Sequence, residues 1–158
     1  MIMKTKMILF MMIALFLFWG MGCERETSDI DSMKQKLIGT WEWIVSYGGV
    51  VGESKPHPGE ELEIIFTDNR VLITHNLEVI DNQAVIADNK KVIQDGSYAI
   101  SKEDEKYYLT ITPKEGEPEL YYLSGKREFY INQTSDTLGI GFSTGTSNFS
   151  ASLYIKVH

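Results

Sequence analysis

The sequence predicts an all-β domain built as an antiparallel sandwich or barrel. Short segments after Leu37 alternate apolar and polar residues with a period of two, which is typical of strands that bury one face. Turn-forming pairs such as Asp68-Asn69 and Asp81-Asn82 separate these segments, and no segment after Leu37 has the 3.6-residue period of an amphipathic helix. About eight such strands suffice to close a barrel around a small interior.

The first 22 residues differ in composition from the rest of the chain. Lys4 and Lys6 form a short basic region, and Met7 to Trp19 is an uninterrupted apolar stretch. That stretch is shorter than the roughly 20 residues that a membrane-spanning helix needs, and it matches the apolar core of a secretory signal. We therefore expect residues 1–22 to be a signal peptide.

Cys23 is the only cysteine of the chain, so no internal disulfide is possible. Gly20-Met21-Gly22 places small residues where signal peptidases select them, and cleavage would fall directly before Cys23. At this point the sequence resembles a bacterial lipoprotein signal, in which the cysteine becomes the lipidated N-terminus. The resemblance implies diacylglycerol on the sulfur and an amide-linked acyl chain such as palmitate. It also implies a membrane anchor in the cell envelope, which we expect to be in the outer membrane.

Residues 23–36 are mostly charged and polar, as expected of a tether, and Ser28 or Asp29 is placed to begin a turn of helix that ends at Leu37. Residues 37–158 then form the domain. Removal of Lys4 and Lys6 with the signal peptide changes the formal net charge from −7 to −9. This acidic balance repels nucleic acid, which we exclude as a partner.

Seven segments of the domain carry the strand pattern, and they are residues 39–47, 61–66, 70–75, 106–112, 128–132, 137–142 and 152–157. Further turns are predicted at Asp88-Asn89 and Asp95-Gly96. The connection Gly48 to Glu60 contains four glycines and two prolines, so we expect an irregular loop over one end of a barrel. Such a loop is either a functional lid or a plain connection, and the sequence does not favour one over the other.

The stretch LIGTWEWIVSYGG, residues 37–49, is similar to the opening of a lipocalin-like domain, with Gly39-Thr40-Trp41 in the place of that family's Gly-x-Trp. Residues 136–157 are similar to the last hairpin of small lipocalin-like lipoproteins common in Bacteroidota. The resemblance implies a single up-and-down barrel of about eight strands with Trp41 near the closed end. It also implies that Lys156, where the family more often has Arg, covers Trp41 in a cation–π contact. Gly39, Trp41 and Lys156 are expected to be structural.

The sequence contains one pattern that suggests a hydrolase. GFSTG, residues 141–145, satisfies the Gly-x-Ser-x-Gly of a nucleophile elbow, which requires a strand, a sharp turn and a helix. Here another strand pattern follows, no acidic residue occurs after Ser143, and the only later histidine is His158. A hairpin turn explains these residues better.

Other catalytic and metal-binding patterns are also absent from the sequence. His57 and His75 are isolated, with no metal-ligand spacing around them, and we interpret His75 as an ordinary strand residue. Glu60, Glu61 and Glu63 are interpreted as a solvated acidic face. We therefore expect no enzymatic activity, no metal site and no cofactor.

Two hypotheses for the function remain after these exclusions. The first is a binding lipoprotein whose barrel holds a small apolar or amphipathic ligand at its open end. The second is an interaction module with a filled barrel, whose surface docks an envelope protein or glycan. Tyr107-Tyr108 and Tyr121-Tyr122 place one tyrosine on each face of a strand, so they are compatible with both hypotheses.

Overall fold

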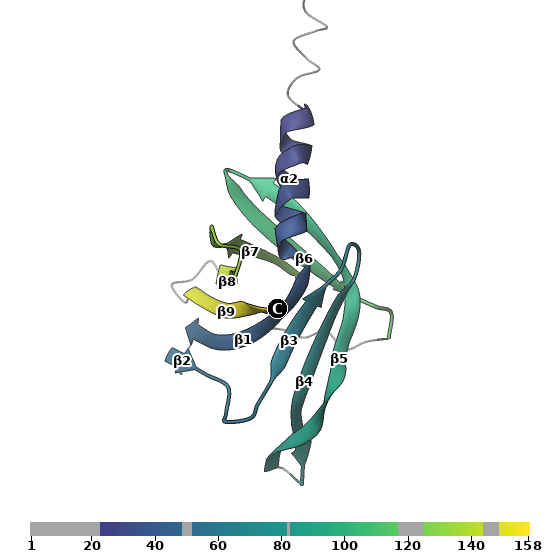
Figure 1. The fold of residues 1–158 in the computed structure, drawn as a ribbon, viewed down its shortest axis with the longest axis vertical. Helices are drawn as coiled ribbons and strands as arrows, with labels where there is room; N and C mark the ends of the chain where they lie inside the picture. The colour runs from purple at the N-terminus through teal and green to yellow at the C-terminus, as the bar shows by residue number, and fades with distance from the viewer. Residues whose placement is uncertain (1–22, 49–51, 82, 117–124, 144–148) are drawn as a thin grey trace, which may run out of the picture. The chain divides into compact units, whose positions relative to one another are not determined.

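The computed structural model describes residues 23–48, 52–81, 83–116, 125–143 and 149–158 (Figure 1). The chain divides into two units between Met33 and Lys34, and all the described strands belong to the second. The elements are α2 (Cys23–Leu37), β1 (Gly39–Gly48), β2 (Gly52–Ser54), β3 (Leu62–Phe66), β4 (Val71–Ile80), β5 (Gln83–Glu103), β6 (Lys106–Pro113), β7 (Gly125–Ile131), β8 (Thr137–Ser143) and β9 (Phe149–Val157).

The strands form a closed antiparallel barrel. Each strand from β3 to β8 pairs with the next along the chain, while β1 pairs with β3 at one edge and with β9 at the other. The short β2 extends the β3 edge of β1. The ring therefore contains eight strands in up-and-down order, which confirms the predicted all-β barrel.

The core of the barrel follows from the period-two pattern. Trp41 lies opposite Ile64, and Ile64 lies opposite Ile73, so one buried row crosses β1, β3 and β4. The largest fully buried side chains are Trp41, Tyr154, Phe66, Leu37, Ile64, Ile73, Leu109, Leu138, Ile140, Gln94 and Val71. Burial of each large apolar side chain stabilises the fold by about 1.5–3 kcal/mol.

The helix α2 is longer than the single turn that the sequence predicted. It ends at Leu37, as expected, but it begins at Cys23. Ile30, Met33 and Leu37 recur at spacings of three and four residues, which is the apolar pattern of a helix within an otherwise polar segment. Lys34 and Lys36 lie in its last turn, where positive charge interacts favourably with the helix dipole.

The turns predicted at Asp88-Asn89 and Asp95-Gly96 are wrong, because both pairs lie inside the 21-residue strand β5. The register between β4 and β5 shifts twice, so bulges absorb the extra residues of β5. A Cβ atom on Gly96 would lie 2.4 Å from the carbonyl oxygen of Thr112 on β6. This glycine therefore permits the close approach of two strands rather than a reversal of the chain. The turn predicted at Asp68-Asn69 is confirmed, since Thr67 N donates to Arg70 O across it.

The β4–β5 pair continues beyond the barrel as a two-stranded ribbon (Figure 1). Pairing of β3 with β4 ends at His75, whereas β4 and β5 remain paired as far as Ile80 and Gln83. Five exposed aliphatic side chains gather on this pair of strands, namely Val79, Ile80, Val85, Ile86 and Val92.

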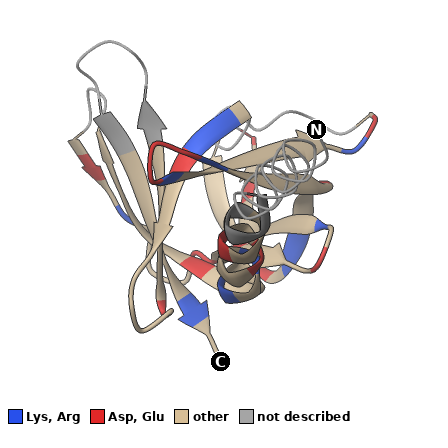
Figure 2. Ribbon diagram, turned by 90° about the horizontal axis from the view of Figure 1, so that it is seen from above, with Lys and Arg blue, Asp and Glu red and all other residues tan. Residues whose placement is uncertain are grey.

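Charged side chains of both signs are distributed over the strands and turns of the barrel (Figure 2). Several form ion pairs between neighbouring or next-neighbouring strands, such as Lys106 with Glu128 at 3.0 Å and Lys91 with Glu78 at 2.8 Å. Because these pairs are largely exposed, each contributes about 0–1 kcal/mol.

Candidate functional site

The inward-facing residues change from fully buried to half-buried along the barrel. Trp41, Ile64 and Ile73 are completely inaccessible to solvent. Two residues further along the same faces, Trp43 on β1 and His75 on β4 are half-buried. The barrel is therefore fully packed around Trp41, Ile64 and Ile73, whereas Trp43 and His75 are partly exposed towards its other end. We call the second end the mouth, and it is marked by Ser46, Leu62, His75 and Ser152.

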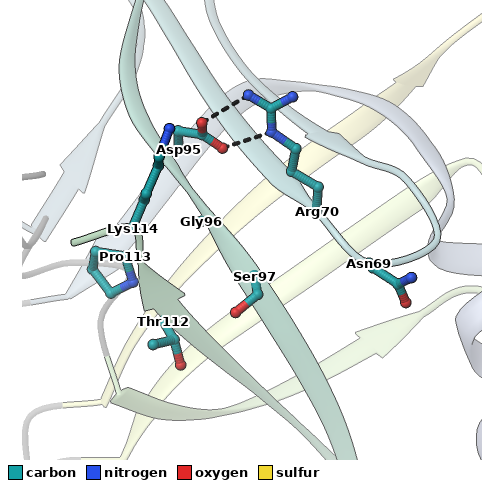
Figure 3. Close-up of a pocket in the computed structure, with 8 residues that line it drawn as sticks. All are labelled: Asn69, Arg70, Asp95, Gly96, Ser97, Thr112, Pro113 and Lys114. Carbon is teal, nitrogen blue, oxygen red and sulfur yellow. Dashed lines mark hydrogen bonds and ion pairs between the residues drawn. The ribbon is translucent and has the colours of Figure 1, made fainter.

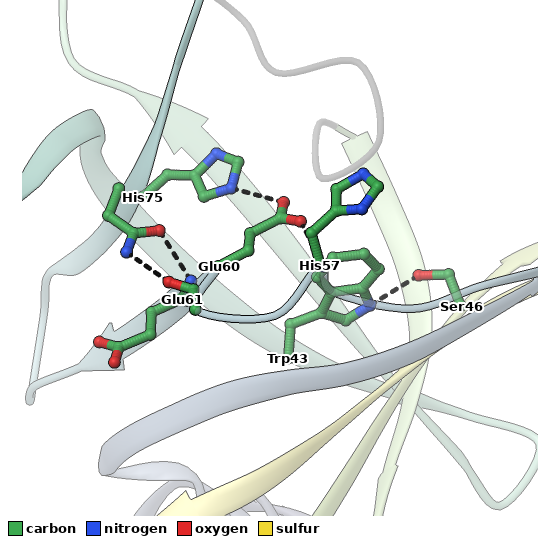
Figure 4. Close-up of polar contacts among 8 residues, drawn as sticks. Trp43, Ser46, His57, Glu60, Glu61 and His75 are labelled. Atoms are coloured by element: carbon green, nitrogen blue, oxygen red, sulfur yellow. Dashed lines mark hydrogen bonds and ion pairs between the residues drawn. The ribbon is translucent and has the colours of Figure 1, made fainter. Parts of the chain in front are cut away.

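A buried carboxylate lies at the mouth. Glu60 is two residues before Leu62, which pairs with His75, and the Oε1 atom of Glu60 lies 2.9 Å from Nε2 of His75 (Figure 4). Its Oε2 atom accepts a hydrogen bond of 2.8 Å from the backbone N–H of His57. The side chain of Glu60 is only 6 % exposed, so the expectation of a solvated acid at this position is wrong.

The segment that carries Glu60 is fixed to β4. The amide side chain of Asn76 donates from Nδ2 to Gly59 O and accepts at Oδ1 from Glu61 N, each at 2.8 Å (Figure 4). The backbone of Asn76 donates to Glu61 O at 3.2 Å, and Glu60 N donates to His57 O at 2.9 Å. We call residues 55–61 the strap. Its prolines limit the conformations of the free chain, and its hydrogen bonds hold it in one arrangement.

A short hydrogen-bond chain lies on the neighbouring strands β1 and β9. Trp43 Nε1 donates to Ser46 Oγ at 2.9 Å, and Ser46 Oγ lies 2.7 Å from Ser152 Oγ (Figure 4 shows the first of these bonds). Ser46 and Ser152 are also direct partners in the β1–β9 register. A tryptophan, two hydroxyls and an acid–histidine pair thus lie at one end of the barrel. This mixture of an aromatic ring and a few polar groups is typical of a small-molecule site.

The residues predicted from the family resemblance lie at the closed end. Trp41 Nε1 donates to Leu37 O at 2.7 Å, and Lys156 Nζ donates to Lys36 O at 3.0 Å. The expected contact between Trp41 and Lys156 is present, with Nζ 5.1 Å from the ring centroid. A Cβ atom on Gly39, whose φ is +135°, would lie 2.8 Å from Lys156 Cε. These residues therefore support each other at the end of the barrel opposite to the mouth.

The other sequence candidates are dispersed. Gly141 and Ser143 lie within β8, Gly145 falls outside the described residues, and His158 follows β9. Glu61 and Glu63 pair with Lys90 at 2.9 and 2.8 Å on the barrel surface. In the described part of the chain, no group of three or more His, Cys, Asp or Glu side chains is arranged to hold a metal ion.

The tyrosine pairs are described only in part. Lys126 Nζ lies 4.5 Å from the ring centroid of Tyr108, and Lys102 Nζ lies 5.6 Å from that of Tyr107. Tyr121-Tyr122 lies outside the described residues. The most exposed of the described tyrosines are Tyr47 and Tyr130. Neither belongs to the two tyrosine pairs that the sequence analysis singled out.

A concave region lies at the start of β4, away from the mouth. It is a depression of about 510 Å³ lined by Asn69, Arg70, Asp95, Gly96, Ser97, Thr112, Pro113 and Lys114 (Figure 3). Arg70 occupies it with a bidentate ion pair, both of whose bonds to Asp95 are 2.7 Å. The hydrogen bonds from Arg70 hold the pKa of Asp95 below its usual value. Because these groups satisfy each other, this depression is better explained as a clasp between β4 and β5.

Comparison of the chain with protein-family models, curated proteins and solved structures gives no match. The site must therefore be interpreted from its own geometry. Among the described helices, none combines the length and apolar character required to cross a bilayer.

Proposed function

We propose that this chain is a lipid-anchored envelope lipoprotein with a lipocalin-like barrel that binds a small apolar or amphipathic ligand at its mouth. The observation that carries the proposal is the change in burial between Trp41 and Trp43 on one face of β1. The closed end needs its aromatic ring for packing, whereas the ring at the mouth remains partly accessible to another molecule.

The polar groups of the mouth support the same proposal. A buried acid–histidine pair costs desolvation energy, and a well-packed apolar pair of the same volume is often as stable. Glu60, His75, Ser46 and Ser152 are therefore better explained as recognition groups around an apolar ring than as core residues. The strap carries one of these groups, so ligand contact and strap position are coupled in this arrangement.

The proposed cellular location rests on the sequence. The apolar segment Met7 to Trp19 and Cys23 together match a lipoprotein signal, and two acyl attachments suffice for stable anchoring. Residues 23–37 form a polar helix that would separate the anchor from the barrel along the chain. We place the protein at the outer membrane of the cell envelope.

The experiment is native purification of residues 24–158 followed by mass spectrometry of the extracted small molecules. A bound apolar or amphipathic compound, lost from a Trp43→Ala variant with an unchanged urea unfolding midpoint, is the expected result. A folded chain that retains no compound after exposure to envelope extracts would contradict the proposal.

One observation favours the second candidate, a protein- or glycan-interaction module. Val79, Ile80, Val85 and Ile86 are exposed on the β4–β5 ribbon, and exposed aliphatic groups of this kind often mark an interface. Capture of a partner that depends on Val79 and Ile80, in the absence of any extracted ligand, would favour this module over the binding lipoprotein.

A further inference from the structure

The hydrogen-bond chain of Trp43, Ser46 and Ser152 contains one more donor hydrogen than it has hydrogen bonds. An indole N–H can only donate, so the bond from Trp43 occupies a lone pair of Ser46 Oγ. The hydroxyls of Ser46 and Ser152 bring two protons, but the single contact of 2.7 Å between them needs only one. Among the described residues neither hydroxyl has a further hydrogen-bond acceptor, so within that part of the chain one O–H donor has no partner.

The contact between the two hydroxyls fits either one as the donor, so cooperativity is the argument for one order. A chain in which each member accepts once and donates once is polarised in one direction and is therefore cooperative. That order runs from Trp43 to Ser46 and from Ser46 to Ser152, so the last O–H belongs to Ser152. Its residue is only 9 % exposed, and it lies opposite Ile140, which is 1 % exposed. A donor buried in this way without an acceptor costs about 1–3 kcal/mol.

We propose that the Ser152 hydroxyl anchors the ligand by donating to a neutral carbonyl oxygen, as in an ester or amide, while the apolar part of the ligand packs near Trp43. This inference rests on the function proposed above. Trp43 and Ser46 are positioning residues, because they direct the proton of Ser152 without having to touch the carbonyl themselves.

The charge at the mouth selects a neutral head group over an anionic one. Glu60 places a buried carboxylate at the same end of the barrel, and its charge partner there is the imidazole of His75. An anionic head group beside Glu60 would bring a second carboxylate close to the first, and two carboxylates at close range disfavour each other's charged forms. A neutral ester can accept a hydrogen bond from the same hydroxyl without this charge repulsion.

The test uses the mature chain, residues 23–158, made without its signal peptide. The neutral fluorescent probe 1-aminoanthracene reports occupancy of the mouth, and methyl dodecanoate, dodecanoate and dodecane compete for it. We expect methyl dodecanoate to compete best with the wild type. Ser152→Ala should weaken competition by the ester about three- to tenfold, the effect of one neutral hydrogen bond, and leave that of dodecane within twofold.

Two further variants separate this role from a structural one. Ser152→Thr keeps the hydroxyl and should restore competition by the ester. Ser97→Ala removes an exposed serine of β5 and should change nothing. Urea unfolding midpoints show that each variant is folded.

The outcomes distinguish the two proposals. If the wild type and Ser152→Ala bind the probe and respond equally to ester and dodecane, the anchoring role is overturned while the binding function stands. If the folded wild type binds neither the probe nor any competitor, the proposed function fails, and the anchoring role fails with it.

Discussion

Lys156 Nζ lies 5.1 Å from the centroid of the Trp41 ring while it donates a hydrogen bond to Lys36 O, so one cation satisfies both an aromatic face and a helix end. The indole N–H of Trp41 donates to Leu37 O in turn. Two of the carbonyl groups that a helix leaves unpaired at its C-terminus are thereby satisfied by barrel side chains.

Replacing Lys156 by Met removes the charge and keeps most of the apolar stem. We expect Lys156→Met to lower the free energy of unfolding by about 1–2 kcal/mol, because the cation–π contact and the hydrogen bond to Lys36 O are both lost. Urea denaturation measures the change. The control is Lys55→Met, which removes an exposed ion pair with Glu53 and should change the free energy of unfolding much less than Lys156→Met does. Equal effects of the two variants would show that the Lys156 contact adds nothing.

The position of Lys156 over the Trp41 ring requires a glycine at residue 39, because a Cβ atom there would overlap the Lys156 side chain. Gly39→Ala should lower the free energy of unfolding by about 2–4 kcal/mol, because its φ of +135° is strained for other residues and the new Cβ would overlap Lys156 Cε. Gly52→Ala is the matched control, since Gly52 also has a positive φ of +78° but has open space around it. We expect about 1 kcal/mol there by thermal or urea unfolding. In the double variant Gly39→Ala/Lys156→Ala the new Cβ no longer overlaps Lys156 Cε. The part of the lost free energy of unfolding that is due to this overlap should therefore be recovered.

The barrel was predictable because most strands bury one face and therefore alternate in sequence. Trp41 and Ile64 illustrate this, since each occupies an alternate position in a segment that reads as a strand on its own. β5 was only partly predictable. Its first half is largely exposed, and Asp88 and Asn89 lie in a register shift between the pairs His75–Lys91 and Leu77–Ile86, which no local pattern reports.

The mouth was harder to predict than the barrel, because its contacts join distant parts of the chain. Glu60 follows a Gly- and Pro-rich segment and therefore reads as solvated, yet its histidine partner lies 15 residues later. The hydroxyls of Ser46 and Ser152 are 106 residues apart. One signal was present for Glu60, namely that it continues the inward period of Leu62 and Ile64 by one step.

Glu60 is expected to be the residue that holds the strap. Glu60→Ala should lower the free energy of unfolding by about 2–4 kcal/mol, because it leaves His75 and the backbone N–H of His57 without an acceptor. Glu60→Gln retains an acceptor and should cost about 1 kcal/mol. Hydrogen exchange at the His57 amide should accelerate more in the alanine variant. Glu61→Ala, at an exposed neighbour, is the control, and faster exchange there of the same size would contradict a specific role for Glu60.

The clasp between Arg70 and Asp95 should make stability depend on pH. The hydrogen bonds from Arg70 lower the pKa of Asp95 in the folded state below its ordinary value. The stabilisation is therefore present above the pKa of the unfolded state and is lost as the pH falls through the lower pKa of the folded state. We expect Asp95→Asn to be slightly less stable than the wild type at pH 7, with a smaller effect than Gly39→Ala. The difference should vanish as the pH falls through the lowered pKa of Asp95 in the folded state. Because the pair is exposed, added salt should also reduce the difference, and a constant difference at all pH values would exclude this ion pair as its source.

Cys23 is expected to decide where the protein resides. In a bacterial host that processes lipoproteins, the wild type should remain in the membrane fraction after a high-salt wash, because acyl chains bind through about 0.8 kcal/mol per buried methylene and not through charge. Cys23→Ala should be recovered in the soluble fraction, or retained with an uncleaved signal peptide that intact-mass measurement identifies. Met33→Ala, which alters the same helix without touching the sulfur, should stay in the membrane fraction. Salt-resistant membrane retention of a correctly cleaved Cys23→Ala chain would show that something other than the sulfur anchors it, and the lipoprotein proposal would then be wrong.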